Sequence, residues 1–181
     1  MRAGVIALLG IPGSGKALVH RRLCDVHGFQ RVRFGDPLRD MLRAGFGVHV
    51  EDEDGRPLTQ PVPHLNDYRP FHLMEKLGDW CRRRVSGDLL AREWLRRVSR
   101  LDGLIVADDI HEEVEAAAVR SIGGLVVRVT RPNWEPPARG QLHRRIGPIL
   151  ADLEMINHGP DVLLMSTDAL ASEVKALCAG G

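Results

Sequence analysis

Three glycines and a lysine near the start of the chain form a pattern that could bind phosphate. Residues 10–16 read GIPGSGK and follow an apolar stretch, residues 5–9, that is typical of a buried strand. The glycines let the backbone curl so that its N–H groups point at an anion, and the lysine can reach the β- and γ-phosphates of a nucleotide. We expect nucleotide contacts from Gly10, Gly13, Ser14, Gly15, Lys16 and Ala17, with Lys16 also catalytic.

The residue after this lysine departs from the usual pattern. A Ser or Thr normally follows, and its hydroxyl ligates Mg²⁺. Here Ala17 and then Leu18 follow Lys16, and neither carries a hydroxyl. Either carboxylates and water hold the metal, or the chain binds nucleotide without efficient turnover.

Two carboxylates follow a second apolar run, residues 104–107. Asp108 and Asp109 would then lie at the carboxyl edge of a parallel sheet, where ligands bind and where a carboxylate can orient Mg²⁺. We expect this pair to be the metal ligands, without choosing between the two. The alternatives are a polar loop start or a helix cap, since Asp109 could cap the helix that follows.

A second group of residues could bind the phosphate acceptor. Arg39 can hold a phosphate bidentately, and Asp36 can accept a proton from an attacking hydroxyl as a general base. Arg69 precedes a predicted helix over residues 71–84, and Arg82 lies in its last turn. A capped helix explains Asp36 alone, and basic residues in a last turn are favoured by the helix dipole.

The stretch 131–148 combines prolines, an exposed-looking Trp134 and several arginines. Among them, Arg139, Arg144 and Arg145 resemble a mobile lid over transferring phosphates, and we take Arg144 as a catalytic candidate. A solvated loop is the competing interpretation. The histidines show no metal-site spacing, and His20 and His27 are expected at the surface of a helix.

Apolar runs and helical patterns alternate along the chain. Strands are expected at residues 5–9, 104–107, 125–129 and 162–165, with a second strand ending near residue 34. Helices are expected at residues 17–27, 71–84 and 112–121. This alternation predicts a three-layer α/β fold, a parallel sheet flanked by helices.

The bulk properties fit one soluble domain over residues 1–181, with a surface loop at 47–70. The content of 44% hydrophobic and 27% charged residues argues against a disordered tail, and a net charge of +1 announces no polyanionic partner. Three cysteines without paired spacing suggest a reduced cytoplasmic setting. We expect neither a signal peptide nor a membrane span, and the apolar helix faces would allow a homodimer.

The order of these motifs resembles the phage-type deoxynucleoside monophosphate kinases, with animal-type phosphomevalonate kinase as a more distant relative. The resemblance runs through GIPGSGK (10–16), FGDPLRDML (34–42), RPFHLMEKLGDWCRR (69–83), VADDIHEEVEAAAVRSIGGLVVRVTRP (106–132) and DLEMINHGP (152–160). It implies a nucleoside monophosphate kinase-like P-loop fold that uses ATP and Mg²⁺, with an acceptor-binding insertion at about 37–100 and a lid at about 131–148. It also places Asn157 near the donor base.

The resemblance implies transfer of the γ-phosphoryl group of ATP to a deoxynucleoside monophosphate, in the cytoplasm or in the host cytoplasm of a phage. Two departures keep other readings open: Ala17 replaces the usual Asp, and His111 replaces an arginine after the strand-end Asp. Losing that arginine weakens a dianion pocket, so the acceptor could instead be the hydroxyl of a hydroxymethyl-pyrimidine in DNA. A third reading is a nucleotide-binding regulator with weakened catalysis.

Overall fold

The computed structural model describes residues 4–51, 58–134 and 146–179. The chain divides into two compact units, one formed by Met1–Phe34 and Trp94–Gly181 and the other by Gly35–Glu93. The sequence predicted an acceptor-binding insertion at about residues 37–100, a range that overlaps the second unit. None of the helices in the described ranges is long and apolar enough to cross a membrane.

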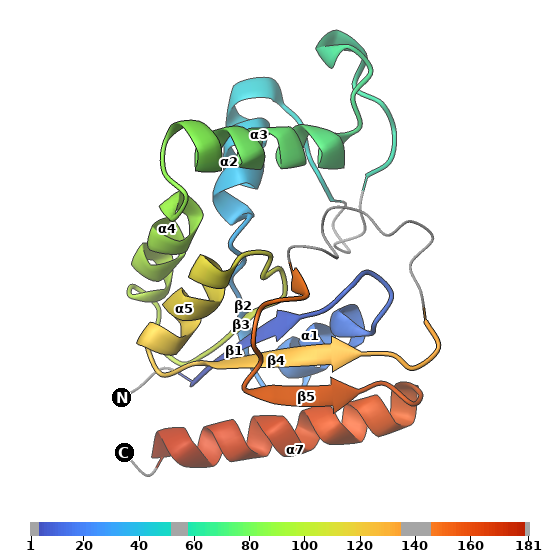
Figure 1. Cartoon of the computed structure of the whole chain (residues 1–181), viewed down its shortest axis with the longest axis vertical. Helices are drawn as coiled ribbons and strands as arrows, with labels where there is room; N and C mark the ends of the chain where they lie inside the picture. Colours follow the sequence, from blue (N-terminus) through green and yellow to red (C-terminus); the bar gives the residue numbers. More distant parts are fainter. Residues whose placement is uncertain (1–3, 52–57, 135–145, 180–181) are drawn as a thin grey trace. The chain divides into compact units, whose positions relative to one another are not determined.

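The first unit is built on a five-stranded parallel sheet with the strand order β2-β3-β1-β4-β5 (Figure 1). Its strands are β1 (Gly4–Leu9), β2 (Gln30–Arg31), β3 (Leu104–Ala107), β4 (Leu125–Thr130) and β5 (Leu153–Ile156). The strands expected at 5–9, 104–107 and 125–129 are therefore confirmed. β1 lies in the middle of the sheet, so the loop that follows it leaves from the centre of the carboxyl edge.

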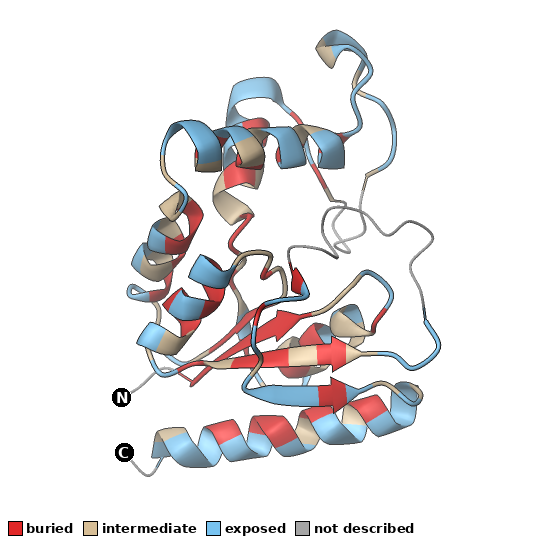
Figure 2. Ribbon diagram, viewed as in Figure 1, coloured by how far each residue is buried: buried red, intermediate tan, exposed pale blue. Residues whose placement is uncertain are grey.

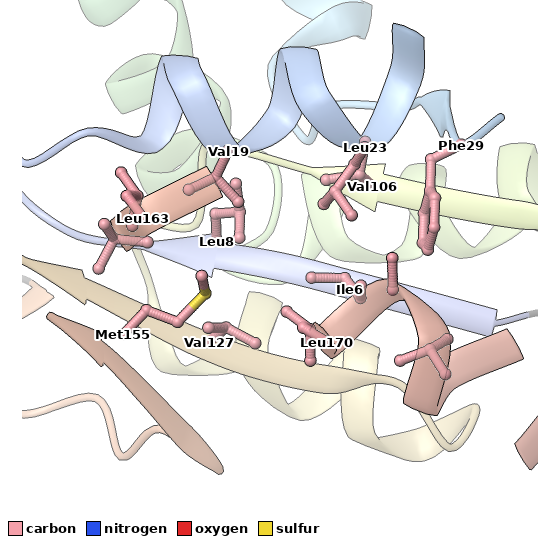
Figure 3. Packing of buried hydrophobic residues seen from close by; sticks show 13 residues of the cluster. Ile6, Leu8, Val19, Leu23, Phe29, Val106, Val127, Met155, Leu163 and Leu170 are labelled. Atoms are coloured by element: carbon pink, nitrogen blue, oxygen red, sulfur yellow. The ribbon is translucent and has the colours of Figure 1, made fainter. Parts of the chain in front are cut away.

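Helices cover both faces of this sheet, which confirms the expected three-layer α/β class. α1 (Lys16–Asp25) and α7 (Pro160–Ala179) pack against each other and against β1, and α5 (Glu113–Ser121) packs against β1 and β4. Figure 3 shows Ile6 and Leu8 of β1 among side chains of α1 and α7. Successive strand residues point to opposite faces of the sheet. Because helices cover both faces, every residue of β1 is buried, as Figure 2 shows.

The strand expected at residues 162–165 is wrong, because this segment belongs to α7. Leu163, Thr167, Leu170 and Val174 are buried while Met165 is exposed, a spacing of three and four that marks one face of a helix. A run of four apolar residues is too short to distinguish a strand from a helix. The fifth strand is instead β5, whose central buried residue is Met155.

The second unit is helical. It contains α2 (Asp36–Phe46), the short 3₁₀ helix η1 (Pro63–Leu65), α3 (Pro70–Arg84) and the start of α4 (Leu89–Val98). The apolar faces of α2 and α3 meet in a core of their own, formed by Leu38, Leu42, Val48, Val50, Met74, Cys81 and Leu90. The expected helix at 71–84 is confirmed, whereas α4 was not predicted.

Trp94, in the middle of α4, anchors the segment before α2. Its ring stacks on Phe34 with the ring centroids 4.6 Å apart, and its indole N–H donates to the carbonyl oxygen of Val32 at 2.9 Å. The side chain is fully buried, so the indole N–H needs this partner. The end of the chain's first βαβ unit is thereby held in place.

Candidate active site

The loop of residues 10–16 connects the central strand β1 to α1, as the sequence predicts. Gly13 and Gly15 have φ angles of 83° and 115°, values that favour glycine, and Gly15 is the N-cap of α1. Lys16 is the first residue of α1, and its ammonium donates to the carbonyl oxygens of Gly10 at 2.5 Å and Ile11 at 3.1 Å. The N-terminus of α1, the glycine-rich loop and one cation therefore lie together, which is the arrangement expected of a phosphate-binding loop.

The ammonium of Lys16 is a perturbed group. Burial lowers its pKa from 10.5 to about 8, although Asp108 and Asp109 act in the opposite direction by attracting the proton. The charged form is therefore costly within the loop, and a phosphate placed beside it would favour that form.

This pKa leads to a prediction on pH. Lys16 is protonated below about pH 8 and loses its charge above it, while a terminal phosphate, with its second pKa near 6, is already ionised. We expect ADP affinity to be constant between about pH 7 and 8 and then to fall, by up to about tenfold per pH unit, because the neutral amine binds phosphate poorly. Calorimetric titration of ADP against pH measures this, and Lys16→Met should give weak binding without the fall.

Asn157 joins the loop of residues 10–16, called the phosphate loop below after its expected ligand, to the turn between β5 and α7. Its side-chain amide donates to the carbonyl oxygen of Ser14 at 2.9 Å, and its Oδ1 accepts from the N–H of Gly159 at 3.1 Å. Its backbone N–H donates to the carbonyl oxygen of Thr130 at 2.7 Å. This one residue therefore fixes the loop, the end of β4 and the start of α7 relative to one another.

A cavity of about 400 Å³ lies beside this junction. It is lined by Leu18, Arg131, Pro132, Asn133, Asn157, His158, Gly159 and Pro160. Apolar, amide and guanidinium groups from three segments of the first unit thus surround one space. A cavity of this size next to the loop of residues 10–16 has room for the base and sugar of a nucleotide.

Asp108 is held by two basic residues that the sequence did not connect with it. The guanidinium of Arg31 donates to both of its carboxylate oxygens, at 3.1 and 2.6 Å, and Nδ1 of His20 lies 3.0 Å from Oδ2. Burial by itself would raise the pKa of Asp108, but His20 and Arg31 outweigh it and hold the pKa well below its usual value. The expectation that His20 lies at the surface is wrong, because it is buried on the inner face of α1.

His27 also differs from its expected place at the surface. Its Nε2 lies 2.7 Å from Oδ1 of Asp168, which also receives the guanidinium of Arg22. The His27 side chain is only 14% exposed. This group ties the end of α1 to α7.

The described residues do not form a preformed Mg²⁺ site. Ala17 offers a methyl group, both oxygens of Asp108 are engaged by Arg31 and His20, and Oδ1 of Asp109 accepts from a backbone N–H. Within the described ranges no group of three or more His, Cys, Asp or Glu side chains is placed to hold a metal ion. The metal role of Asp108 and Asp109 stays a prediction, and the contacts of Asp108 argue against it.

Replacing Asp108 should show that it acts as an internal ion-pair partner. In Asp108→Asn the Arg31 guanidinium would lose its carboxylate, and we expect unfolding to become easier by about 2 kcal/mol, less than for a fully buried pair because Arg31 is 27% exposed. Urea denaturation near neutral pH measures this. Asp88→Asn is the matched control: it breaks an exposed pair with Arg92 and should leave the midpoint almost unchanged. Equal effects would contradict the structural role of Asp108.

Asp109 and the segment after it are held by hydrogen bonds to backbone. Oδ1 of Asp109 accepts from the N–H of Phe34 at 2.9 Å. The buried carboxylate of Glu115 accepts from the N–H groups of His111, at 2.7 Å, and Glu112, at 3.2 Å. These contacts complete a capping box at the start of α5 and fix the path of the backbone around His111.

The acceptor candidates lie in the second unit. Arg39 is paired with Glu51 at 3.2 Å and lies 3.8 Å from Asp36, so an acceptor phosphate would have to compete with two carboxylates. Arg69 is exposed at the N-cap of α3, and Arg82 is half-buried in its last turn. Their roles in binding an acceptor stay predictions.

Part of the predicted lid falls outside the described residues. This applies to Arg139, Arg144 and Arg145, and with them to the catalytic role expected of Arg144. Trp134, which precedes them, is described and lies on the phosphate loop: its indole N–H donates to the carbonyl oxygen of Pro12 at 3.0 Å. The sequence marked Trp134 only as exposed, and its contact with the loop was not foreseen.

With this geometry in place, solved structures give a clear fold comparison. A shikimate kinase from Bacteroides thetaiotaomicron matches with a TM-score of 0.55 and 11% identity, over 95% of this chain and 98% of that one. The shikimate kinase from Aquifex aeolicus matches with a TM-score of 0.53 and 15% identity, over 96% and 98%. The chain therefore shares the α/β fold of these two kinases. No family model matches the sequence, and no curated protein does either.

Proposed function

We propose that this protein is a P-loop kinase that transfers the γ-phosphoryl group of ATP to a deoxynucleoside monophosphate. The observation that carries the proposal is the loop of residues 10–16, with Lys16 at the start of α1 and the cavity of about 400 Å³ beside it. The P-loop kinase fold supports the reaction class, and the resemblance of the motifs to phage-type kinases supports the acceptor class.

The roles of the chain's own residues follow from this geometry. The loop amides and the N-terminus of α1 bind the donor phosphates, and the Lys16 ammonium neutralises charge that moves toward the bridging oxygen as the phosphoryl group is transferred. Leu18, Arg131 and Asn157 line the cavity that receives the donor base. Mg²⁺ would arrive with ATP and neutralise part of its charge, without a ready-made cluster of carboxylates to hold it.

The second unit supplies the acceptor-binding residues in this proposal. Arg39, Arg69 and Arg82 bind the acceptor phosphate, for which a guanidinium offers a bidentate fork. Asp36 keeps a base role only if the acceptor is a hydroxyl, because a monophosphate is already a nucleophile at neutral pH.

Two observations favour a second acceptor class, the hydroxyl of a hydroxymethyl-pyrimidine in DNA. Arg39 is already paired with Glu51 and lies near Asp36, and His111 stands where the resembled family has an arginine. A dianionic phosphate therefore finds fewer unopposed charges, whereas a hydroxyl needs only a base such as Asp36. The leading proposal remains the monophosphate, because the resemblance covers nearly the whole chain.

The test is ADP formation from Mg-ATP with two sets of acceptors. One set holds the deoxynucleoside monophosphates, and the other holds single-stranded and duplex DNA with hydroxymethyl-pyrimidines. Turnover with free monophosphates alone supports the leading proposal. Turnover with modified DNA alone assigns the second. Nucleotide binding without turnover on either set would instead identify a regulator, as Ala17 suggests.

A further inference from the structure

Trp134 touches the phosphate loop at its crown, formed by Pro12 and Gly13. The indole N–H donates to the carbonyl oxygen of Pro12 at 3.0 Å. The ring also lies so close to Gly13 that a Cβ built on that glycine would be 2.6 Å from Cε2 and Nε1 of the indole. Gly13 has a φ of 83°, so the backbone conformation and the ring contact both require glycine there.

Trp134 also holds an arginine of the base cavity. The guanidinium carbon of Arg131 lies 5.2 Å from the centroid of the Trp134 ring, within the range of a cation–π contact. Arg131 is exposed and lines the cavity beside the loop. A long exposed side chain has many rotamers, and contact with a large ring reduces their number.

One residue therefore contacts both parts of the donor site. It bonds to the loop that cradles the phosphates, and it contacts the arginine that faces the cavity for the base. Trp134 is 38% exposed and opens a proline-rich stretch after the end of β4.

We propose that Trp134 is a positioning residue for the donor nucleotide: it fixes the crown of the phosphate loop and orients Arg131 toward the nucleoside part of a purine nucleotide. This rests on the proposed function, because it takes the ligand of the loop to be a nucleotide. Trp134 acts through Pro12, Gly13 and Arg131, so its effect falls on nucleotide affinity.

The experiment measures ADP affinity by calorimetry in the full-length protein and three variants at position 134 or 131. Trp134→Phe keeps a ring but removes the N–H donor, Trp134→Ala removes both contacts, and Arg131→Ala removes the partner in the cavity. We expect about threefold weaker ADP binding for Trp134→Phe and about tenfold or more for Trp134→Ala, from the loss of one hydrogen bond and one cation–π contact. Trp80→Ala is the control, since Trp80 is exposed on α3 in the second unit.

A double-mutant cycle separates positioning from general stability. If Trp134 orients Arg131, then Trp134→Ala should cost about threefold, instead of tenfold, in the Arg131→Ala background. Urea midpoints should remain close to the wild-type value, and ADP should change the tryptophan emission of the wild type but not that of Trp134→Phe. Wild-type ADP affinity in Trp134→Ala, or full additivity in the cycle, overturns the inference. Failure of the wild type itself to bind ADP or ATP would overturn the proposed function.

Discussion

Replacing Lys16 by Ala should reduce phosphoryl transfer by at least about 100-fold while the protein stays folded. The loop holds the ammonium of Lys16 through the carbonyl oxygens of Gly10 and Ile11. In the proposed function this ammonium neutralises the transferring phosphates, and removal of one preorganised charged donor has a large effect on the rate. Stability should not suffer, because burial disfavours the charged amine and lowers its pKa to about 8.

The measurement is the rate of ADP formation with the best acceptor of the two sets, together with urea denaturation of each variant. Lys76→Ala is the matched control. Lys76 is one of the few other lysines, and its ammonium lies 5.1 Å from the ring centroid of Tyr68 on the second unit, where loss of charge should not affect the donor phosphates. Normal turnover by Lys16→Ala would contradict the assignment of this loop to the active site.

The parts that the sequence predicts well are those determined by neighbouring residues. The glycines of residues 10–16 adopt positive φ angles that other residues rarely adopt, so their presence indicates a tight loop. The apolar runs that form β1, β3 and β4 are continuous because this sheet is covered on both faces. Both signals are contained in fewer than ten consecutive residues. The central strands and the loop at their carboxyl edge could therefore be predicted from the sequence alone.

The parts that could not be predicted depend on contacts between distant segments. Arg31 and Asp108 are 77 residues apart, and nothing near Asp108 indicates that an arginine already engages its carboxylate. Likewise the contact of Trp134 with Pro12 joins residues separated by 122 positions. A carboxylate at a strand end has the same local sequence whether it binds a metal ion or an arginine. The residues around Asp108 therefore could not distinguish a metal ligand from an ion-pair partner.

The interior of α7 shows a different limit. Its apolar segment 162–165 is short, and the periodicity that identifies a helix emerges only when Thr167 and Leu170 are seen to be buried with Leu163. Thr167 is polar, and its hydroxyl donates to the carbonyl oxygen of Leu163 at 2.7 Å, which lets it lie inside. A polar residue whose hydroxyl is hydrogen-bonded within its own helix can lie on the buried face. It therefore interrupts the apolar periodicity of the sequence although the helix face it belongs to is buried.

Gly10→Ala should lower both the free energy of unfolding and the affinity for nucleotide, because a Cβ on Gly10 would collide with the backbone of the neighbouring strand β4. A Cβ on Gly10 would lie 2.4 Å from the carbonyl oxygen of Val129 and 2.9 Å from Oγ of Ser14. Val129 belongs to β4, which pairs with β1 on one side and β5 on the other, so its carbonyl cannot move away without breaking the sheet. We expect a loss of about 3 kcal/mol in the free energy of unfolding and at least about tenfold weaker ADP binding.

Gly45→Ala provides the matched control for this change. Gly45 lies within α2, and a Cβ there would meet nothing within 4 Å, so alanine should stabilise the helix by about 0.5–1 kcal/mol and leave ADP affinity unchanged. Urea denaturation and ADP titration of both variants measure the contrast. If Gly10→Ala behaved like Gly45→Ala, the carbonyl of Val129 would not be fixed, and the loop could not be the rigid cradle on which phosphate binding depends.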